Sequence, residues 1–197
     1  MGLKKKKILR ALDGKITLPP PFWFMRQAGR YLPEYREIRK TVKDFLDLCY
    51  SIDLATEITL QPVNRLNTDA AILFSDILVI PDAMGQRVSF REGIGPVLAP
   101  LKNKHDILNL NTETFMENLG PIFDIIKKIC IQLPEDKALI GFSGSPWTLA
   151  VYMIEGRTTR DCSLTRIFAY REPEAFKILI EMLVNSVSVY LEKQIES

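Results

Sequence analysis

The sequence predicts an α/β fold built on parallel strands. Short apolar runs alternate along the chain with longer segments whose apolar residues recur at helical spacing. The apolar runs lack strict alternation with polar residues, which is typical of strands covered on both faces. The chain has 197 residues, of which 47% are hydrophobic and 25% charged, enough apolar material for a sizeable core. We expect a single domain over residues 1–197.

At the first expected elements the composition changes abruptly from apolar to charged residues. The apolar run at 22–25 is the first expected strand, and arginines begin directly after it. Residues 32–41 predict a short helix, because Pro33 near the start suits a first helical turn. Residues 44–66 predict a longer helix that Pro62 shortens or kinks.

The alternation continues to the end of the sequence. Residues 69–80 are the second expected strand, and residues 86–100, rich in glycine and proline, predict an irregular hairpin. Residues 111–132 open with Asn and Thr and carry lysines late, which suits a helix dipole. Residues 138–142 are the third expected strand. The segment from 173 to the end predicts a helix of about six turns.

Charge and apolar content argue against two classes of partner. The net charge is +2, and the only basic run, Lys4–Lys7, is short and terminal. We therefore interpret that run as a solvated arm and expect no nucleic-acid surface. No stretch reaches the roughly 18 apolar residues of a membrane-spanning helix. We expect a cytoplasmic protein without a membrane partner.

The residues that most often bind metals are sparse. Cys49, Cys130 and Cys162 are widely separated and form no paired motif, which argues against a disulfide framework and against a zinc site. The one histidine, His105, stands among Asn, Lys and Asp residues. We expect it to be a solvated loop residue without a catalytic role.

Residues 22–36 read Phe-Trp-Phe-Met-Arg-Gln-Ala-Gly-Arg-Tyr-Leu-Pro-Glu-Tyr-Arg. We call residues 25–36 of this run the arginine motif. Guanidinium groups bind carboxylates in planar, two-bond geometry and keep their charge when partly desolvated. Three of them after an apolar run predict recognition of several carboxylates. The alternative is a surface turn with solvated arginines.

Residues 74–78, Phe-Ser-Asp-Ile-Leu, form the aspartate motif. Its Asp76 interrupts an apolar run, so its carboxylate must be hydrogen-bonded, ion-paired or directed at a solvent-filled cleft. If the strand belongs to a barrel, its carboxyl end faces the active site, where a carboxylate can meet cationic chemistry. A helix cap or a salt bridge is the structural alternative.

Residues 141–156, Gly-Phe-Ser-Gly-Ser-Pro-Trp-Thr-Leu-Ala-Val-Tyr-Met-Ile-Glu-Gly, form the glycine motif. Gly141, Gly144 and Pro146 suit a strand that turns sharply into a helix. We expect Ser145 in the loop and Trp147 in the core.

These three motifs, in this order, closely resemble signatures of the uroporphyrinogen decarboxylase family. Members of that family convert four acetate side chains of a cyclic tetrapyrrole into methyl groups. The resemblance implies a (β/α)8 TIM barrel, of which this chain resembles only the N-terminal portion, because a closed barrel takes about 250 residues and three of its strands are found here. It also implies a homodimer for the complete enzyme.

The resemblance implies roles for three charged residues. Asp76 accepts hydrogen bonds from the pyrrole N–H groups of the tetrapyrrole substrate and stabilises the cation formed during the reaction. Arg26 and Arg30 bind substrate carboxylates. We predict that Arg26, like Asp76, is catalytic, because one arginine delivers a proton in this scheme. The high pKa of arginine makes it an awkward acid.

The resemblance adds three weaker candidates for substrate binding. Gln27 and Arg39 are placed in the same cleft, and Tyr152 at the substrate. As structural alternatives, Gln27 only pins the loop backbone and Arg39 is an ordinary exposed helix residue. The implied reaction needs no cofactor, because protonation turns the pyrrole ring itself into the electron sink.

The chain also departs from the family pattern. Residues 157–160, Arg-Thr-Thr-Arg, stand where the family continues with glycine and serine. The family's later serine and terminal histidine have no counterpart, so we expect the chain to be truncated and its catalysis alone to be in question. The alternatives are a non-catalytic fragment that binds a tetrapyrrole or a partner, a related corrinoid methyltransferase and, least favoured, a basic nucleic-acid module.

Overall fold

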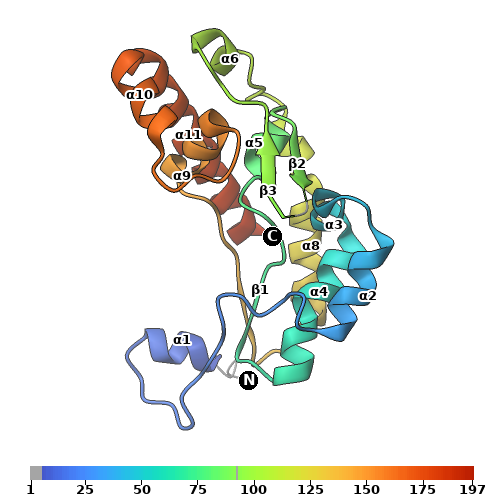
Figure 1. Ribbon diagram of the computed structural model, residues 1–197. Coiled ribbons are helices and arrows are strands. Elements are labelled where there is room, and N and C mark those ends of the chain that lie inside the picture. Colours follow the sequence, from blue (N-terminus) through green and yellow to red (C-terminus); the bar gives the residue numbers. More distant parts are fainter. Residues whose placement is uncertain (1–5, 92) are drawn as a thin grey trace.

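The computed structural model describes residues 6–91 and 93–197 (Figure 1). Its helices are α1 (Lys7–Leu12), α2 (Pro33–Thr41), α3 (Phe45–Tyr50), α4 (Ile52–Leu66), α5 (Val79–Ala83), α6 (Lys104–Leu108), α7 (Phe115–Asn118), α8 (Gly120–Gln132), α9 (Pro146–Glu155), α10 (Ser163–Arg171) and α11 (Pro173–Glu196). Its strands are β1 (Ala70–Ile72), β2 (Val88–Arg91), β3 (Gly95–Leu98) and β4 (Ala138–Ile140). In Figure 1, α2, α3, α4 and α8 lie on one side of β1, and α9, α10 and α11 lie on the other.

Strands β1 and β4 pair in parallel, with Ala70 opposite Ala138 and Ile72 opposite Ile140. The chain between them runs through helices and the β2–β3 hairpin, the long connection that parallel strands require. Helix α4, which precedes β1, packs against α8, which precedes β4. This arrangement confirms the predicted α/β class with parallel strands.

The predicted hairpin at 86–100 is confirmed as antiparallel β2 and β3, with Val88 opposite Leu98. Its backbone is fastened to the end of α9. The Leu98 amide donates to the Gly156 carbonyl and the Leu101 amide to the Met153 carbonyl, both at 2.8 Å. The hairpin therefore connects the middle of the chain to the glycine motif.

The main core lies between the short parallel sheet and helices α4, α8, α9 and α11. Its fully buried members include Ile80, Ile122, Leu149, Leu179 and Leu183. A second, smaller cluster joins helices α2, α3 and α4. It consists of Leu32, Tyr35, Leu48 and Ile58, with Phe74 packed against it. Phe74 thus connects the aspartate motif to the helix that follows the arginines.

The run at 22–25 is not a strand, and the prediction of a strand covered on both faces is wrong. All four side chains are exposed, from Trp23 at 39% to Met25 at 75%. The backbone of Phe22 bonds only to Asp69: its carbonyl accepts from the Asp69 amide and its amide donates to the Asp69 carboxylate. Along the described chain no strand pairs with this run, so its side chains stay in contact with solvent.

The second expected strand, 69–80, is also wrong in extent, because β1 spans only Ala70–Ile72. The Phe74 amide donates to the hydroxyl of Thr59 on α4 at 2.9 Å, which takes the backbone out of the ladder. The chain then turns and enters α5. Asp76 consequently lies in the loop after the strand.

Residues 44–66 form two helices where one was expected. Ser51 has an extended backbone that separates α3 from α4. Pro62 lies inside α4 without ending it, since the helix continues to Leu66 and stops at Asn67, which is left-handed at φ 52°. The extended backbone at Ser51, and not the proline, divides this segment.

Residues 111–132 likewise divide into α7 and α8. The Asn111 side chain accepts from the amides of Glu113 and Thr114, which makes the segment before α7 a turn. Leu119 then separates the two helices, and Pro121 lies in the first turn of α8. The predictions of α2, of the strand at β4 and of the long terminal helix α11 are confirmed in place.

Four short helices of the described chain were not predicted: α1, α5, α6 and α10. His105 lies in α6 and not in a loop, although it is exposed as expected. Trp147 is 46% exposed, so its expected place in the core is wrong. Of the basic run, Lys4 and Lys5 lie outside the described residues, while Lys7 belongs to α1. Among the described helices, none has the length and apolar content to cross a membrane.

Candidate active site

The loop after β1 presents Asp76 at the carboxyl end of the parallel sheet. Its Oδ1 accepts from the Leu78 amide at 2.8 Å, and its carbonyl accepts from the Val79 amide. The carboxylate therefore closes a turn immediately before α5 without capping the helix, so the helix cap of the structural alternative is not found. Burial raises the pKa of Asp76 above its ordinary value, and the Leu78 hydrogen bond opposes that rise only in part. Oδ2 has no hydrogen-bond partner among the described residues.

Asp76 influences the buried thiol of Cys49 on α3. Burial raises the pKa of Cys49, and the negative charges of Asp76 and then Asp44 raise it further. The thiol therefore stays protonated, which makes it inert as a nucleophile. Cys49 is fully buried.

Arg26 and Arg30 lie in the exposed loop between the apolar run and α2. Within residues 6–91 and 93–197, neither guanidinium takes part in an ion pair or hydrogen bond. The backbone of this loop is held from α2, because the Arg36 guanidinium donates to the Arg30 carbonyl at 2.9 Å. The hydroxyl of Tyr31 donates to the carbonyl of Gln27. The loop is thus fixed while two of its cations remain available to a ligand.

Gln27 attaches the arginine motif to the sheet. Its side chain is only 1% exposed. Nε2 donates to the carbonyl of Ala70 in β1 at 3.0 Å, and Oε1 accepts from the Phe24 amide. These contacts correspond to the structural alternative in which Gln27 pins the loop backbone.

Arg39 lies in the last turn of α2 and is half-buried. Its guanidinium donates to the carbonyls of Val42 and Lys43, so it caps its own helix. Burial raises the pKa of Tyr35, and the positive charges of Arg39 and then Arg30 oppose that rise only in part.

Tyr35 also joins these cations to the aspartate motif. Its ring meets that of Phe74 edge-on, with 5.9 Å between the centroids. Phe74 is two residues before Asp76 in the same loop. The packing therefore brings the arginine and aspartate motifs together through one aromatic pair.

The glycine motif approaches the same loop from the other direction. A Cβ atom built on Gly144 would lie 3.1 Å from Cβ of Ile77, the residue after Asp76. Ser145 caps α9 by accepting from the Thr148 amide at 3.2 Å. Tyr152 is half-buried in α9 and packs at the edge of the main core; its hydroxyl has no hydrogen-bond partner among the described residues. All three motifs thus meet around the carboxyl ends of β1 and β4.

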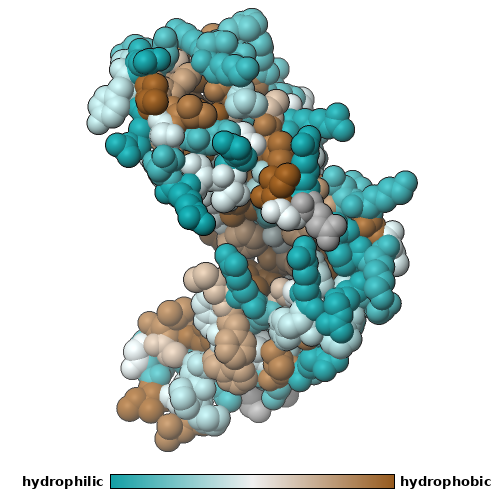
Figure 2. Space-filling view, viewed as in Figure 1, coloured by the Kyte–Doolittle hydropathy of each residue, from teal (hydrophilic) through white to brown (hydrophobic). Residues whose placement is uncertain are grey.

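Figure 2 shows that the molecule is hollowed between two bulges, with brown, hydrophobic atoms in the depth of the hollow. In the matching view of Figure 1, the loop after β1 runs through this region. Two open grooves lie elsewhere on the described chain: one is lined mainly from α2, α4 and α8, the other mainly from α8, β4 and α11. None of the six candidate residues lines either cavity.

Asp69 is a positioning residue that the sequence did not reveal. Its carboxylate accepts from the Phe22 amide at 3.0 Å and lies 3.9 Å from the Lys7 ammonium group. It therefore fixes the entry to the arginine motif. The available signal was an acid directly before an apolar strand, but its partner is 47 residues away in sequence.

A family model described as uroporphyrinogen decarboxylase matches residues 3–197. This chain belongs to the uroporphyrinogen decarboxylase family. The two short parallel strands and their helices are accordingly part of a (β/α)8 barrel, as the sequence predicted.

Individual relatives agree with the family match. The chain is 51% identical over 193 residues to the uroporphyrinogen decarboxylase of Brucella anthropi, covering 98% of this chain and 56% of the relative. It is 50% identical over 194 residues to that of Mesorhizobium japonicum, with the same coverage. The chain therefore spans a little more than half the length of these decarboxylases.

A solved structure supports the fold independently of sequence. A methyltransferase from Methanosarcina mazei superimposes with a TM-score of 0.74, covering 96% of this chain and 55% of that chain. Sequence identity is 15%, so the likeness concerns the fold alone.

Proposed function

We propose that this chain supplies the N-terminal portion of a uroporphyrinogen decarboxylase. The enzyme would convert uroporphyrinogen III into coproporphyrinogen III in porphyrin and haem biosynthesis. The observation that carries the proposal is an identity of about one half to decarboxylases over 98% of the chain. The gathering of the three motifs around one end of the sheet supports the assignment of the site.

The reaction removes carbon dioxide from each of four acetate side chains. The pyrrole ring first takes a proton, and the bond between the acetate methylene and its carboxylate then breaks. The electron pair of that bond passes into the cationic ring, and carbon dioxide leaves. The methylene takes a proton to become methyl, and the ring returns the proton it had gained. In this scheme the ring accepts the electrons, and no cofactor takes part.

Asp76 would stabilise the protonated ring. Its carboxylate is partly desolvated, which makes attraction to a nearby cation stronger than it would be in water. The Leu78 amide fixes Oδ1, and Oδ2 remains able to accept a pyrrole N–H. The bond that closes the turn and the proposed catalytic role are therefore compatible, since each uses a different oxygen.

Arg26 and Arg30 would bind the substrate's carboxylates, and Arg26 would also assist proton delivery. Their exposure and lack of ion pairs in the described chain support this role, because unpaired guanidinium groups in a fixed loop are prepared for anionic ligands. Gln27, Arg39 and Tyr152 are proposed substrate contacts as well. Their hydrogen bonds to the backbone indicate that Gln27 also positions the loop and that Arg39 also caps α2.

The test is reconstitution of activity. The purified chain is incubated with uroporphyrinogen III without oxygen, alone and with a second polypeptide carrying the part of the Brucella anthropi enzyme that this chain does not match. Products are oxidised and counted by chromatography as porphyrins with eight to four carboxylates. We expect four-carboxylate product from the mixture. Failure of the mixture, when the intact relative turns over, would overturn the proposal.

A matched pair of variants tests the site. Asp44 and Asp76 each accept a hydrogen bond from the amide two residues later. Asp76→Asn preserves this bond and removes the charge, so we expect a loss of about 10²–10³-fold in turnover. Asp44→Asn should leave turnover unchanged. Equal activity of the two variants would remove Asp76 from the mechanism.

A second candidate function is binding without turnover. It is favoured by one observation, that the chain spans only 56% of its relatives. Quenching of uroporphyrin fluorescence by the chain alone, without release of carbon dioxide, would support it.

We further propose a cytoplasmic location, a homodimer for the complete enzyme and a single domain for this chain. The family membership supports the first two. Sedimentation of the reconstituted mixture at twice the mass of one complex would support the dimer.

A further inference from the structure

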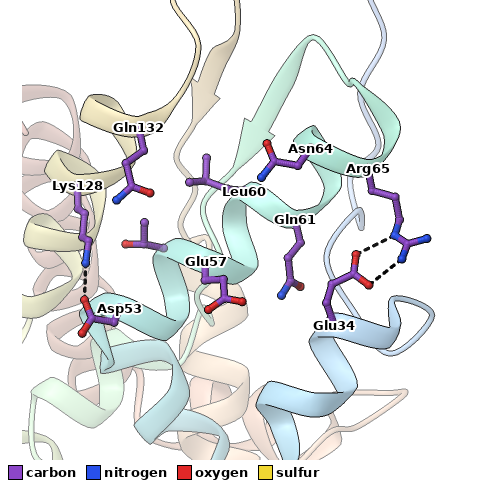
Figure 3. A pocket seen from close by; sticks show the side chains of 10 residues that line it. Glu34, Asp53, Glu57, Leu60, Gln61, Asn64, Arg65, Lys128 and Gln132 are labelled. Carbon is purple, nitrogen blue, oxygen red and sulfur yellow. Dashed lines mark hydrogen bonds and ion pairs between the residues drawn. The ribbon is translucent and has the colours of Figure 1, made fainter.

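A groove of about 880 Å³ lies along α4, away from the proposed active site. We call it the α4 groove. Figure 3 shows its lining side chains, which come from α2, α4 and α8. They are Glu34, Asp53, Thr56, Glu57, Leu60, Gln61, Asn64, Arg65, Lys128 and Gln132.

Gln61 is the unusual member of this lining. It is 7% exposed, and neither its Nε2 nor its Oε1 has a hydrogen-bond partner in the structure. A buried amide left unpaired at both ends destabilises the fold. In Figure 3 the amide lies between the side chains of Glu57 and Glu34. The cost would be recovered if an occupant of the groove offered one donor and one acceptor.

Two other buried glutamines show which group satisfies such an amide at both ends, while a third, Gln86, donates to backbone carbonyls and leaves its Oε1 unpaired. Gln194 donates to the Phe142 carbonyl and accepts from the Phe142 amide, at 3.0 and 3.1 Å. Gln27 pairs in the same way with backbone groups of Ala70 and Phe24. In each case one side-chain amide binds the polypeptide backbone through both of its ends. Gln61 has the same chemistry and no backbone beside it to bind.

The charges of the groove specify the partner further. Glu34 is bound to Arg65 by two hydrogen bonds, and Asp53 to Lys128. Glu57 has no ion pair among the described residues and is exposed. It lies one helical turn before Gln61, on the same face of α4. A basic side chain would complement it.

We propose that the α4 groove binds an extended basic segment of another polypeptide. Gln61 would pair with one backbone N–H and one C=O of the segment, and Glu57 with a lysine or arginine beside them. The side chains next to the amide in Figure 3 are long and partly exposed, so they can move aside when the segment enters.

The experiment is a titration of the isotope-labelled chain followed by NMR. The ligands are two end-capped peptides, Gly-Lys-Gly-Lys-Gly and Gly-Glu-Gly-Glu-Gly. We expect the Gln61 side-chain amide signals to shift on addition of the lysine peptide only. Equal response to both peptides, or no response of Gln61 to either, would overturn the proposal. Self-association of the chain that blocks the lysine peptide would also overturn it.

Variants separate binding from folding. Gln61→Leu should weaken binding about fivefold, the equivalent of one to two hydrogen bonds. It should also raise Tm by about 2–4 °C, because it removes an unpaired buried amide. Glu57→Gln should weaken binding about threefold. Glu135→Gln, an exposed acid outside the groove, should leave it unchanged. A lower Tm for Gln61→Leu would show that the amide already has a partner and would end the proposal.

Discussion

The arginine motif and the glycine motif carry the family resemblance together, yet the molecule uses them in opposite ways. At the start of the arginine motif, the apolar run 22–25 is exposed and the loop is fastened by a few side-chain bonds, chiefly those of Gln27 and Arg36, before Leu32 and Tyr35 enter the smaller core cluster. In the glycine motif, Leu149, Ala150 and Met153 are fully buried, and the backbone itself makes the close contacts.

The two motifs therefore have different roles, one in exposing charged groups and one in forming the structure. The arginine motif presents charge, and its position depends on individual hydrogen bonds. The glycine motif builds the junction between β4, α9 and the hairpin, and its form depends on the absence of side-chain atoms. Substitutions in the glycine motif should therefore reduce stability most, and those at the exposed arginines should mainly affect ligand binding.

The largest effect is expected at Gly156. This residue is left-handed at φ 71°, and an added Cβ would lie 2.9 Å from the Leu98 carbonyl oxygen and 3.3 Å from the Pro100 ring. Gly156→Ala should lower the free energy of unfolding by about 3 kcal/mol, combining the left-handed backbone with overpacking. Urea denaturation followed by circular dichroism measures this loss.

Gly29 in the arginine motif is the matched control. No heavy atom lies within 4 Å of the position of its added Cβ, and its φ is not left-handed. Gly29→Ala should change the free energy of unfolding by less than about 0.5 kcal/mol. If both variants lost the same stability, the contrast between the motifs would be wrong.

The next effect compares the two amides that fasten the motifs. Gln27→Leu and Gln194→Leu each remove two backbone hydrogen bonds in buried positions. Each should lower the free energy of unfolding by about 2 kcal/mol, since the abandoned backbone groups stay desolvated. Thermal denaturation compares both with Gln132→Leu, an exposed control. A neutral Gln27→Leu would mean that the arginine motif is not held by β1.

Substitution of the exposed arginines should weaken ligand binding and leave stability almost unchanged. Arg26→Gln and Arg30→Gln should each change the free energy of unfolding by less than about 0.5 kcal/mol, because neither guanidinium has a partner in the described chain. Each should weaken binding of uroporphyrin, an octacarboxylate, about tenfold through the loss of a charge-assisted contact. Fluorescence titration measures the affinity. Unchanged affinity in both variants would indicate that these arginines are merely solvated.

The same contrast explains what the sequence could predict. Helices α2, α9 and α11 begin with a proline that suits a first turn, and their recurring apolar residues encode a buried face, so local chemistry was enough. The run at 22–25 has the composition of a buried strand, but burial depends on neighbours that the run does not encode. Its exposure was therefore beyond sequence reasoning.

The site residues also divide into those that local sequence could indicate and those that it could not. Arg26, Arg30 and Asp76 could be selected because charge in an apolar context has a cost that local sequence reveals. The parts played by Asp69 and Tyr35 could not, since both act through contacts with segments about 40 residues away or more. Asp76 was placed in a strand because the apolar run gave no sign of the short-range bond by which it closes a turn before α5.

The smallest effect concerns pH and Asp76. Burial raises its folded pKa, so over the range between its unfolded and folded pKa values the folded chain binds more protons than the unfolded chain. Stability contributed by this residue should therefore fall as pH rises through that range. Asp76→Asn keeps the hydrogen bond from the Leu78 amide and should reduce the fall. Asp82 also has a pKa raised by burial, so part of the slope should remain. Urea denaturation from pH 4 to pH 7 measures the slope; an unchanged slope in Asp76→Asn would show that the carboxylate is already well solvated.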